Sequence, residues 1–225
     1  MQTKSTLILA VVLGATVTSK AQISKGSYLI GGFINSVNTK SDFTERPDFE
    51  GNGVAVNTSF GKTIKENLVV GLILAYSAVH TINNYYTADS GDYKLNQYTA
   101  GLFGRKYKLL AKNFYFFGEA NAVYSQVKDK QAFPVNSNYS PVKTNQKIIS
   151  SSLSTGIAYQ VLKKMQMELI IPEIISLQYS TGKLDGGENS AYENQKRNDF
   201  SIYSNLNASP LNYLGLGFKF ILVGK

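Results

Sequence analysis

Large apolar residues alternate with small or polar residues along most of this chain. Between residues 148 and 161, Leu153, Ile157 and Tyr159 share one parity, while serines and Gly156 share the other. A period of two places successive side chains on opposite faces of an extended strand. This alternation predicts eight β-strands, which cover residues 26–36, 53–62, 68–79, 94–107, 114–127, 148–161, 166–180 and about 199–222.

The connections between these strands alternate in length. Short connections cover 63–67, 108–113 and 162–165, and long polar connections cover 37–52, 80–93, 128–147 and 181–198. Short periplasmic turns and long extracellular loops are typical of outer-membrane barrels, whereas a water-soluble β-sandwich has no reason to sort its loops in this way. The chain is therefore expected to be all-β and to fold as an eight-stranded antiparallel transmembrane up-and-down β-barrel.

Residues 1–21 have the pattern of a secretory signal peptide. Lys4 supplies the positive charge, residues 7–13 are apolar, and small residues at positions 19 and 21 predict cleavage before Gln22. An N-terminal transmembrane anchor is the alternative, but this apolar run falls short of the roughly 20 residues that cross a bilayer. The expected mature protein is a single barrel domain, residues 22–225.

The face opposite the large apolar residues is rich in Gly, Ala and Ser and carries a few charges, namely Arg105, Glu119, Glu168 and Lys219. The interior of an eight-stranded barrel is just wide enough for side chains to fill it. Charges of both signs in so narrow a space must pair to survive desolvation. We interpret these residues as a structural polar network in a filled lumen, and we expect no open pore.

Two further features modify the strand pattern. Pro172 cannot donate to a ladder and Glu173 interrupts an apolar face, so a bulge or an edge of the membrane zone is expected there. Aromatic residues collect near the strand ends, as in the girdles of membrane barrels. The expected girdles contain Tyr107, Phe114 and Phe116 on the periplasmic side and Tyr76, Tyr98, Tyr124, Tyr179 and Tyr203 on the outer side.

The end of the chain carries a more specific signal. Tyr213, Gly215, Phe218 and Phe220 resemble the C-terminal strand signal of outer-membrane barrels, in which glycine and aromatic residues lie at alternate positions. With the leader and the loop rhythm, the mature chain resembles the OmpA/OmpX-like superfamily of small porin-family barrels. The resemblance implies that the barrel-assembly machinery reads the last strand, and it implies roles in membrane integrity, adhesion or defence. This family usually ends on the last aromatic residue, whereas five residues follow Phe220 here.

Composition restricts the chemistry. The chain has no cysteine and a single histidine, His80, so thiolate and histidine-rich metal sites are not expected. The net charge of +8 falls to +6 without the two lysines of the leader, and this spread-out charge does not predict nucleic-acid binding. Ser77 and His80 are a candidate nucleophile and base, but residues three apart on a strand face opposite sides. No catalytic residue, metal or cofactor is expected.

The expected function is that of an integral outer-membrane barrel with a structural or surface-interaction role. Its expected partners are membrane lipids, the assembly machinery and, through its loops, extracellular ligands. Three alternatives stay open at this point: a narrow porin-like channel for small solutes, a lipid-modifying enzyme, and a soluble periplasmic barrel that binds an apolar ligand. The last of these requires the large apolar face to point inward.

Overall fold

A computed structural model describes residues 23–41, 48–84, 91–132, 142–185, 195–204 and 215–222. Within these ranges the regular structure is entirely β, and no helix there is long and apolar enough to cross a bilayer. The strands are β1 (Tyr28–Ser41), β2 (Asp48–Lys65), β3 (Leu68–Asn84), β4 (Gly91–Ala111), β5 (Phe114–Ala132), β6 (Val142–Leu162), β7 (Met165–Asp185), β8 (Gln195–Tyr203) and β9 (Gly215–Leu222).

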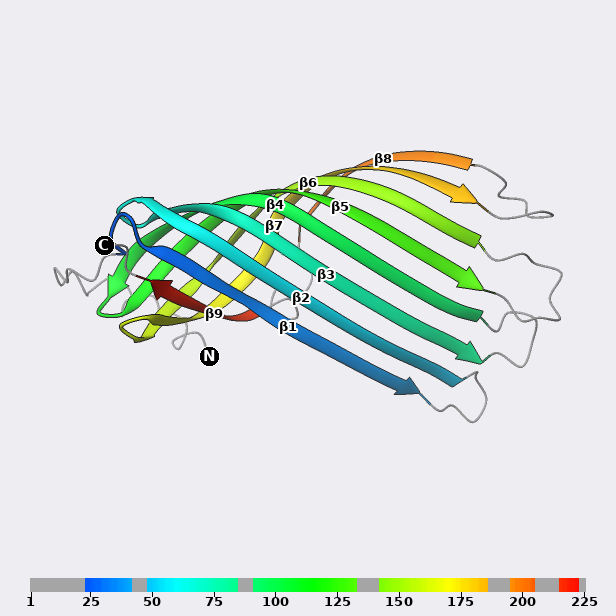
Figure 1. The fold of residues 1–225 in the computed structure, drawn as a ribbon, viewed down its shortest axis with the longest axis horizontal. Helices are drawn as coiled ribbons and strands as arrows, with labels where there is room; N and C mark the ends of the chain where they lie inside the picture. Colours follow the sequence, from blue (N-terminus) through cyan, green and yellow to red (C-terminus); the bar gives the residue numbers. More distant parts are fainter. Residues whose placement is uncertain are drawn as a thin grey trace, which may run out of the picture.

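The sheet closes on itself, and all neighbouring strands are antiparallel (Figure 1). The strand order is β6-β5-β4-β3-β2-β1-β9-β7-β8, and β6 also pairs with β7. Strands β1 to β7 and β9 therefore form a ring of eight, while β8 lies beside β7 alone. The predicted all-β, eight-stranded antiparallel architecture is confirmed.

The last predicted strand is two separate strands. β9 pairs with both β7 and β1, whereas β8 pairs only with residues 176–184 of β7. β1 pairs with β9 only up to Gly32, and beyond Gly32 this edge of β1 has no partner among the described residues. The sequence between β8 and β9 contains Pro210, which cannot donate to a ladder, so a continuous strand is disfavoured. Residues 205–214 themselves lie outside the described residues.

The turns between β2 and β3, β4 and β5, and β6 and β7 contain only two residues each. Asn67 and Asn113 occupy the second position of two of these turns with φ of 59° and 69°. Asparagine tolerates this left-handed conformation better than most residues, which favours tight turns here. We call this end of the barrel the turn end and the opposite end the loop end.

The strands are longer than predicted. β4 contains 21 residues and is about 70 Å long at the usual rise per residue. A tilted membrane-spanning strand needs only about 9–11 residues. β4 gains residues at both ends, whereas β1, β2, β3, β5, β6 and β7 gain most of their extra length toward the loop end. There polar residues replace the large apolar ones, and the hydrophobic alternation that predicts strands disappears.

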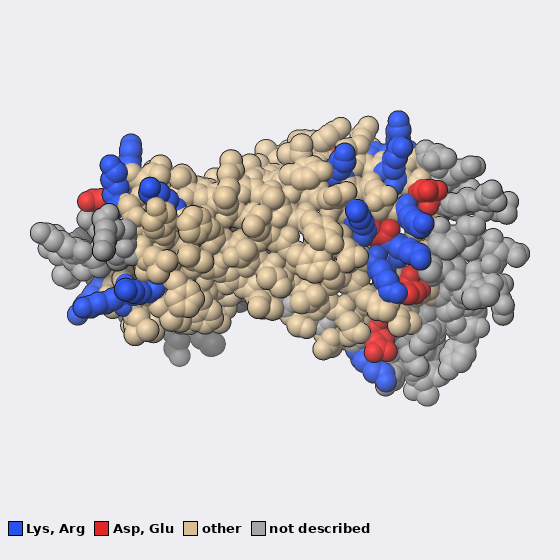
Figure 2. Space-filling view, viewed as in Figure 1, with Lys and Arg blue, Asp and Glu red and all other residues tan. Residues whose placement is uncertain are grey.

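Most large apolar side chains point away from the barrel interior. Among the described residues, 36 large apolar or aromatic side chains are exposed, whereas ten hydrophobic residues are buried. In Figure 2 the middle of the molecule shows a broad band without charged residues, and Lys, Arg, Asp and Glu gather toward the two ends. This arrangement is the reverse of the one that the soluble ligand-binding barrel requires.

Candidate functional site

Three of the four predicted lumen charges meet inside the barrel. Nη2 of Arg105 on β4 lies 2.7 Å from Oε2 of Glu119 on β5, and Nη1 lies 2.6 Å from Oε1 of Glu168 on β7. Arg105 and Glu119 are direct partners in the β4–β5 register, whereas Glu168 reaches them from a strand that is not a neighbour of β4. All three side chains are almost fully buried. The cluster therefore joins distant parts of the barrel wall through its interior.

Tyr107 completes this network, and its predicted place in the periplasmic girdle is wrong. Its side chain is buried, and its hydroxyl accepts a hydrogen bond from Nη1 of Arg105 at 3.0 Å and donates one to Oε1 of Glu168 at 3.1 Å. The guanidinium carbon of Arg105 also lies 4.2 Å from the ring centre of Phe117. Tyr107 shares a face with Arg105 because residues two apart on a strand point to the same side. That spacing is the sequence signal that places it inside.

Lys219 on β9 lines the same lumen but forms no direct ion pair with the carboxylates among the described residues. Its Nζ donates a hydrogen bond to Oγ of Ser59 and lies 5.8 Å from the ring centre of Phe103. Its single positive charge nevertheless balances the formal charge of the cluster, which contains one guanidinium and two carboxylates. The four predicted residues thus share the lumen, and three of them touch.

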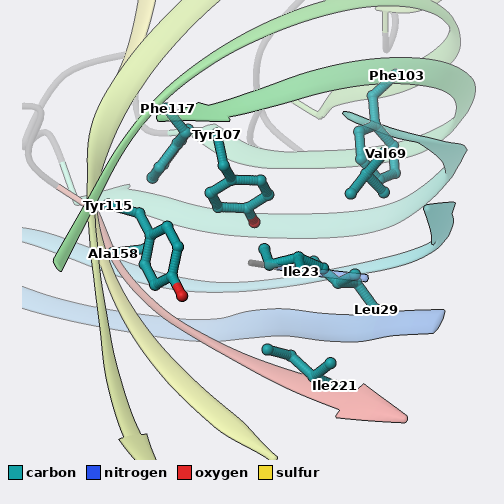
Figure 3. Close-up of a cluster of buried hydrophobic side chains, with 9 residues drawn as sticks. All are labelled: Ile23, Leu29, Val69, Phe103, Tyr107, Tyr115, Phe117, Ala158 and Ile221. Atoms are coloured by element: carbon teal, nitrogen blue, oxygen red, sulfur yellow. The ribbon is translucent and has the colours of Figure 1, made fainter. Parts of the chain in front are cut away.

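A hydrophobic cluster fills the lumen at the turn end (Figure 3). It consists of Ile23, Leu29, Val69, Phe103, Tyr107, Tyr115, Phe117, Ala158 and Ile221. Ile23, five residues before β1 begins, is fixed there by two hydrogen bonds. Its backbone N–H donates to Oδ1 of Asn67 at 3.0 Å, and the N–H of Asn67 donates to the Ile23 carbonyl at 3.1 Å. We call this cluster the apolar plug.

On the loop side of the network lies a cavity of about 790 Å³. Inward-facing polar residues such as Asn57, Gln97 and Thr99 form much of its wall, and the Arg105 network contributes to its lining. The cavity also touches Ile34 and Leu216, which lie where β9 begins and β1 loses its described partner. The lumen is therefore apolar and filled at one end and polar and hollow toward the other.

The predicted bulge on β7 is confirmed at Pro172–Ile174. Leu153 pairs with Ile175 and Thr155 with Ile171, so β7 carries two more residues than β6 between these pairs. An even insertion keeps the apolar residues on both sides of the bulge on the outer face. Glu173 has a φ of 52°, and its backbone N–H donates to Oγ of Ser154 at 3.1 Å.

Tyr203, predicted in the outer girdle, faces the interior instead. It pairs in register with the buried Ser176, and its hydroxyl donates to a carboxylate oxygen of Glu173 at 3.0 Å. Because Ser176 points into the barrel, its direct cross-strand partner does so too. The bulge therefore sets a carboxylate and a phenol into the wall of the cavity.

Ser77 and His80 lie on opposite faces of β3, as their spacing predicts. Nε2 of His80 lies 2.6 Å from Oδ1 of Asp92, and Oδ2 of Asp92 lies 2.9 Å from Nζ of Lys94. The hydrogen bond from Lys94, aided by His80 and opposed by desolvation, holds the pKa of Asp92 below its ordinary value. No group of three or more potential metal ligands occurs in the described ranges.

An outward row of apolar and aromatic residues marks the loop-side edge of the exposed apolar band. Direct register partners join Leu74, Ala100, Tyr124, Ile149, Tyr179 and Phe200 across β3 to β8. Tyr76 and Tyr98 lie one outward position closer to the loop end, with ring centres 5.2 Å apart. We call these residues the aromatic row.

The residues of the proposed C-terminal assembly signal lie on β9 as far as the structure describes them. Phe218 and Phe220 point outward with exposed rings, and Gly215 lies against Ile170 of β7. Tyr213 falls outside the described residues. Phe218 and Phe220 therefore lie on the outer surface of the strand that closes the ring.

Comparisons with known proteins give little beyond this geometry. No family model matches the chain, and no curated protein matches it. The crystal structure of Neisserial surface protein A (NspA) is similar with a TM-score of 0.40 and 15% sequence identity, covering 87% of this chain and 97% of that chain. A similarity at this level carries no argument, so the proposals below rest on the structure of this chain.

Proposed function

We propose that this chain is an integral outer-membrane β-barrel protein with a structural or surface-interaction role. The observation that carries the proposal is the band of exposed apolar side chains around a closed ring of strands. Each large apolar side chain left in water forgoes about 1.5–3 kcal/mol of burial. Lipid removes this cost, and where the ladder closes between residues 28–32 of β1 and β9 it pairs the backbone groups that hydrocarbon cannot satisfy.

The proposed orientation places the loop end outside the cell and the turn end in the periplasm. Two-residue turns at one end and longer connections at the other support this orientation. The proposal includes a cleaved leader, residues 1–21, and recognition of Phe218 and Phe220 by the barrel-assembly machinery. The loops are then the parts that contact extracellular partners.

Membrane fractionation, gel migration and surface proteolysis together test this proposal. The protein is expected in the outer-membrane fraction and is expected to migrate differently before and after boiling, as folded barrels do. A protease site engineered between residues 133 and 141 is expected to be cut in intact cells. A matched site at the turn of residues 163–164 is expected to be cut only after lysis.

Recovery of the protein in the soluble periplasm would contradict membrane insertion. Cleavage of the 163–164 site in intact cells, with the 133–141 site protected, would reverse the orientation. Boiling-dependent migration of each engineered variant is the control that it has folded.

The proposal includes no catalytic step. The opposite faces of Ser77 and His80 support this part, because a nucleophile and its base need hydrogen-bond contact. Ser77→Ala and His80→Ala variants are expected to leave the lipid composition of the outer membrane unchanged, as measured by mass spectrometry of extracted lipids. A modified lipid species that disappears in both variants would establish an enzyme instead.

A further inference from the structure

Outward-facing lysines gather on β4 to β8 on the loop side of the aromatic row, between two and six residues beyond it along each strand. All are exposed, and they share the outer face with Tyr98, Tyr124 and Tyr179. This lysine cluster consists of Lys94, Lys128, Lys130, Lys143, Lys147, Lys183 and Lys196. Figure 2 shows basic side chains gathered toward the loop end.

The register brings several of these lysines directly opposite one another. Lys130 is the cross-strand partner of Lys94 on one side and of Lys143 on the other. Lys183 and Lys196 are likewise direct partners across β7 and β8. Like charges in such positions destabilise a sheet unless an anion lies between them. The lysines of the turn end form no such direct pairs in the described register.

Within the described part of the chain, too few anions lie on this face to compensate the cluster. Asp92 pairs with Lys94, and Asp185 is the register partner of Lys143. Among the described residues, Lys130, Lys143, Lys183 and Lys196 form no ion pair. As far as the structure describes the chain, the cluster therefore presents unbalanced positive charge on the loop side of the apolar band.

We propose that the lysine cluster binds the phosphate groups of outer-leaflet lipids. The inference rests on the proposed function, which sets the aromatic row at the boundary between hydrocarbon and headgroups. Lysine stems extend along apolar surface while their ammonium groups reach the polar layer, where they donate charge-assisted hydrogen bonds to phosphate oxygens. The anion that the paired lysines require is then a lipid headgroup that spans two neighbouring strands.

Vesicles of zwitterionic phospholipid, with and without diphosphorylated lipid A, test the proposal. Adding lipid A is expected to raise the temperature at which the folded gel band of the wild-type protein disappears. The variant Lys130→Gln/Lys143→Gln/Lys183→Gln/Lys196→Gln is expected to lose most of this shift. The matched control Lys108→Gln/Lys112→Gln/Lys163→Gln/Lys164→Gln removes the same charge at the turn end and is expected to keep the shift.

A variant with arginine at the same four cluster positions is expected to keep the shift and controls for folding. Equal shifts in the cluster variant and the turn-end control overturn the assignment, as does the absence of a shift in the wild-type protein. An equal shift with inorganic phosphate alone overturns the lipid as the ligand. Failure of the wild-type protein to float with the vesicles instead refutes the proposed function itself.

Discussion

One guanidinium holds two buried carboxylates together in the lumen. Arg105 contacts Glu119 and Glu168 within 2.7 Å, and Tyr107 hydrogen-bonds to both Arg105 and Glu168. Transferring these charges from water is costly, so the cluster is favourable only while every member keeps its partner. The contacts join β4, β5 and β7, so the loss of one of these residues removes a connection between distant strands of the barrel.

Replacing Arg105 with methionine is expected to destabilise the folded barrel by about 3–5 kcal/mol, because Glu119 and Glu168 are then left buried without a counterion. Urea unfolding in detergent micelles, followed by the loss of the folded gel band, measures this change. The triple variant Arg105→Met/Glu119→Gln/Glu168→Gln removes all three charges and is expected to recover most of the loss. Equal stabilities of the single variant and the wild-type protein would show that the cluster contributes nothing.

Asp92 offers a separate test beyond the apolar band. Lys94 lowers the pKa of the Asp92 carboxyl, so the folded protein stabilises the deprotonated form of Asp92. This stabilisation is lost as the pH falls through the lowered pKa. Lys94→Met is therefore expected to raise the pKa of Asp92 toward 3.8, as followed by NMR titration of the carboxyl carbon. His80→Ala is the comparison variant and is expected to change the pKa less. A larger change with His80→Ala would assign the main effect to the histidine.

At the level of strands, the alternation of apolar and polar residues predicted most of the ring. Leu153, Ile157 and Tyr159 point outward as expected, because outward-facing and lumen-facing residues differ in both size and polarity. The alternation ends where the outer parts of the strands become polar on both faces, so the strand ends were underestimated. Tyr107 and Tyr203 were misplaced because an aromatic residue suits a girdle and a lumen equally well by composition.

The sequence predicts Arg105, Glu119 and Glu168 as charges inside the barrel, but it does not predict which of these side chains contact one another. Register fixes the contact between Arg105 and Glu119, whereas the contact with Glu168 depends on ring closure through β9. The split of the last strand into β8 and β9 has only a weak sequence signal in Pro210. Long-range closure is thus the part of the fold that local pattern does not determine.

Close packing between strands makes one glycine of β3 sensitive to substitution. A Cβ atom on Gly71 would lie 2.5 Å from Cα of Gly61, 2.7 Å from the Phe103 ring and against the Phe60 carbonyl oxygen. Gly71→Ala is therefore expected to destabilise the barrel by about 1–3 kcal/mol in urea unfolding. Gly104→Ala adds a methyl group where nothing lies within 4 Å and is expected to be nearly neutral. The same loss in both variants would show that strand propensity, and not crowding, is responsible.

The aromatic residues of β9 are expected to affect assembly in cells more than intrinsic folding. Phe218→Ala/Phe220→Ala is expected to lower the amount of folded protein in the outer membrane, while the purified variant still refolds in detergent. Phe114→Ala/Phe116→Ala removes two similarly exposed rings from β5 and is the matched control. Equal losses in cells for both variants would indicate general loss of lipid contact instead of a signal in β9.

The whole molecule is divided along its axis into an apolar plug, a charged network and a polar cavity. The plug lies at the turn end, where Ile23 is tied to Asn67 and where Tyr107 belongs to both the plug and the network. The cavity lies toward the loop end. Solutes from the loop side therefore meet a charged cluster and then a close-packed, mainly apolar barrier.

This division predicts that the intact barrel does not conduct ions. Hydrated ions cannot enter an apolar, filled region without losing hydration, and Tyr115 and Phe117 are fully buried there. In planar bilayers the wild-type protein is expected to show no stable current steps, whereas Tyr115→Ala/Phe117→Ala is expected to produce them by opening space through the plug. Boiling-dependent migration of the double variant controls for its folding. Stable steps from the wild-type protein would mean that the plug moves aside, which would favour a narrow channel over a structural barrel.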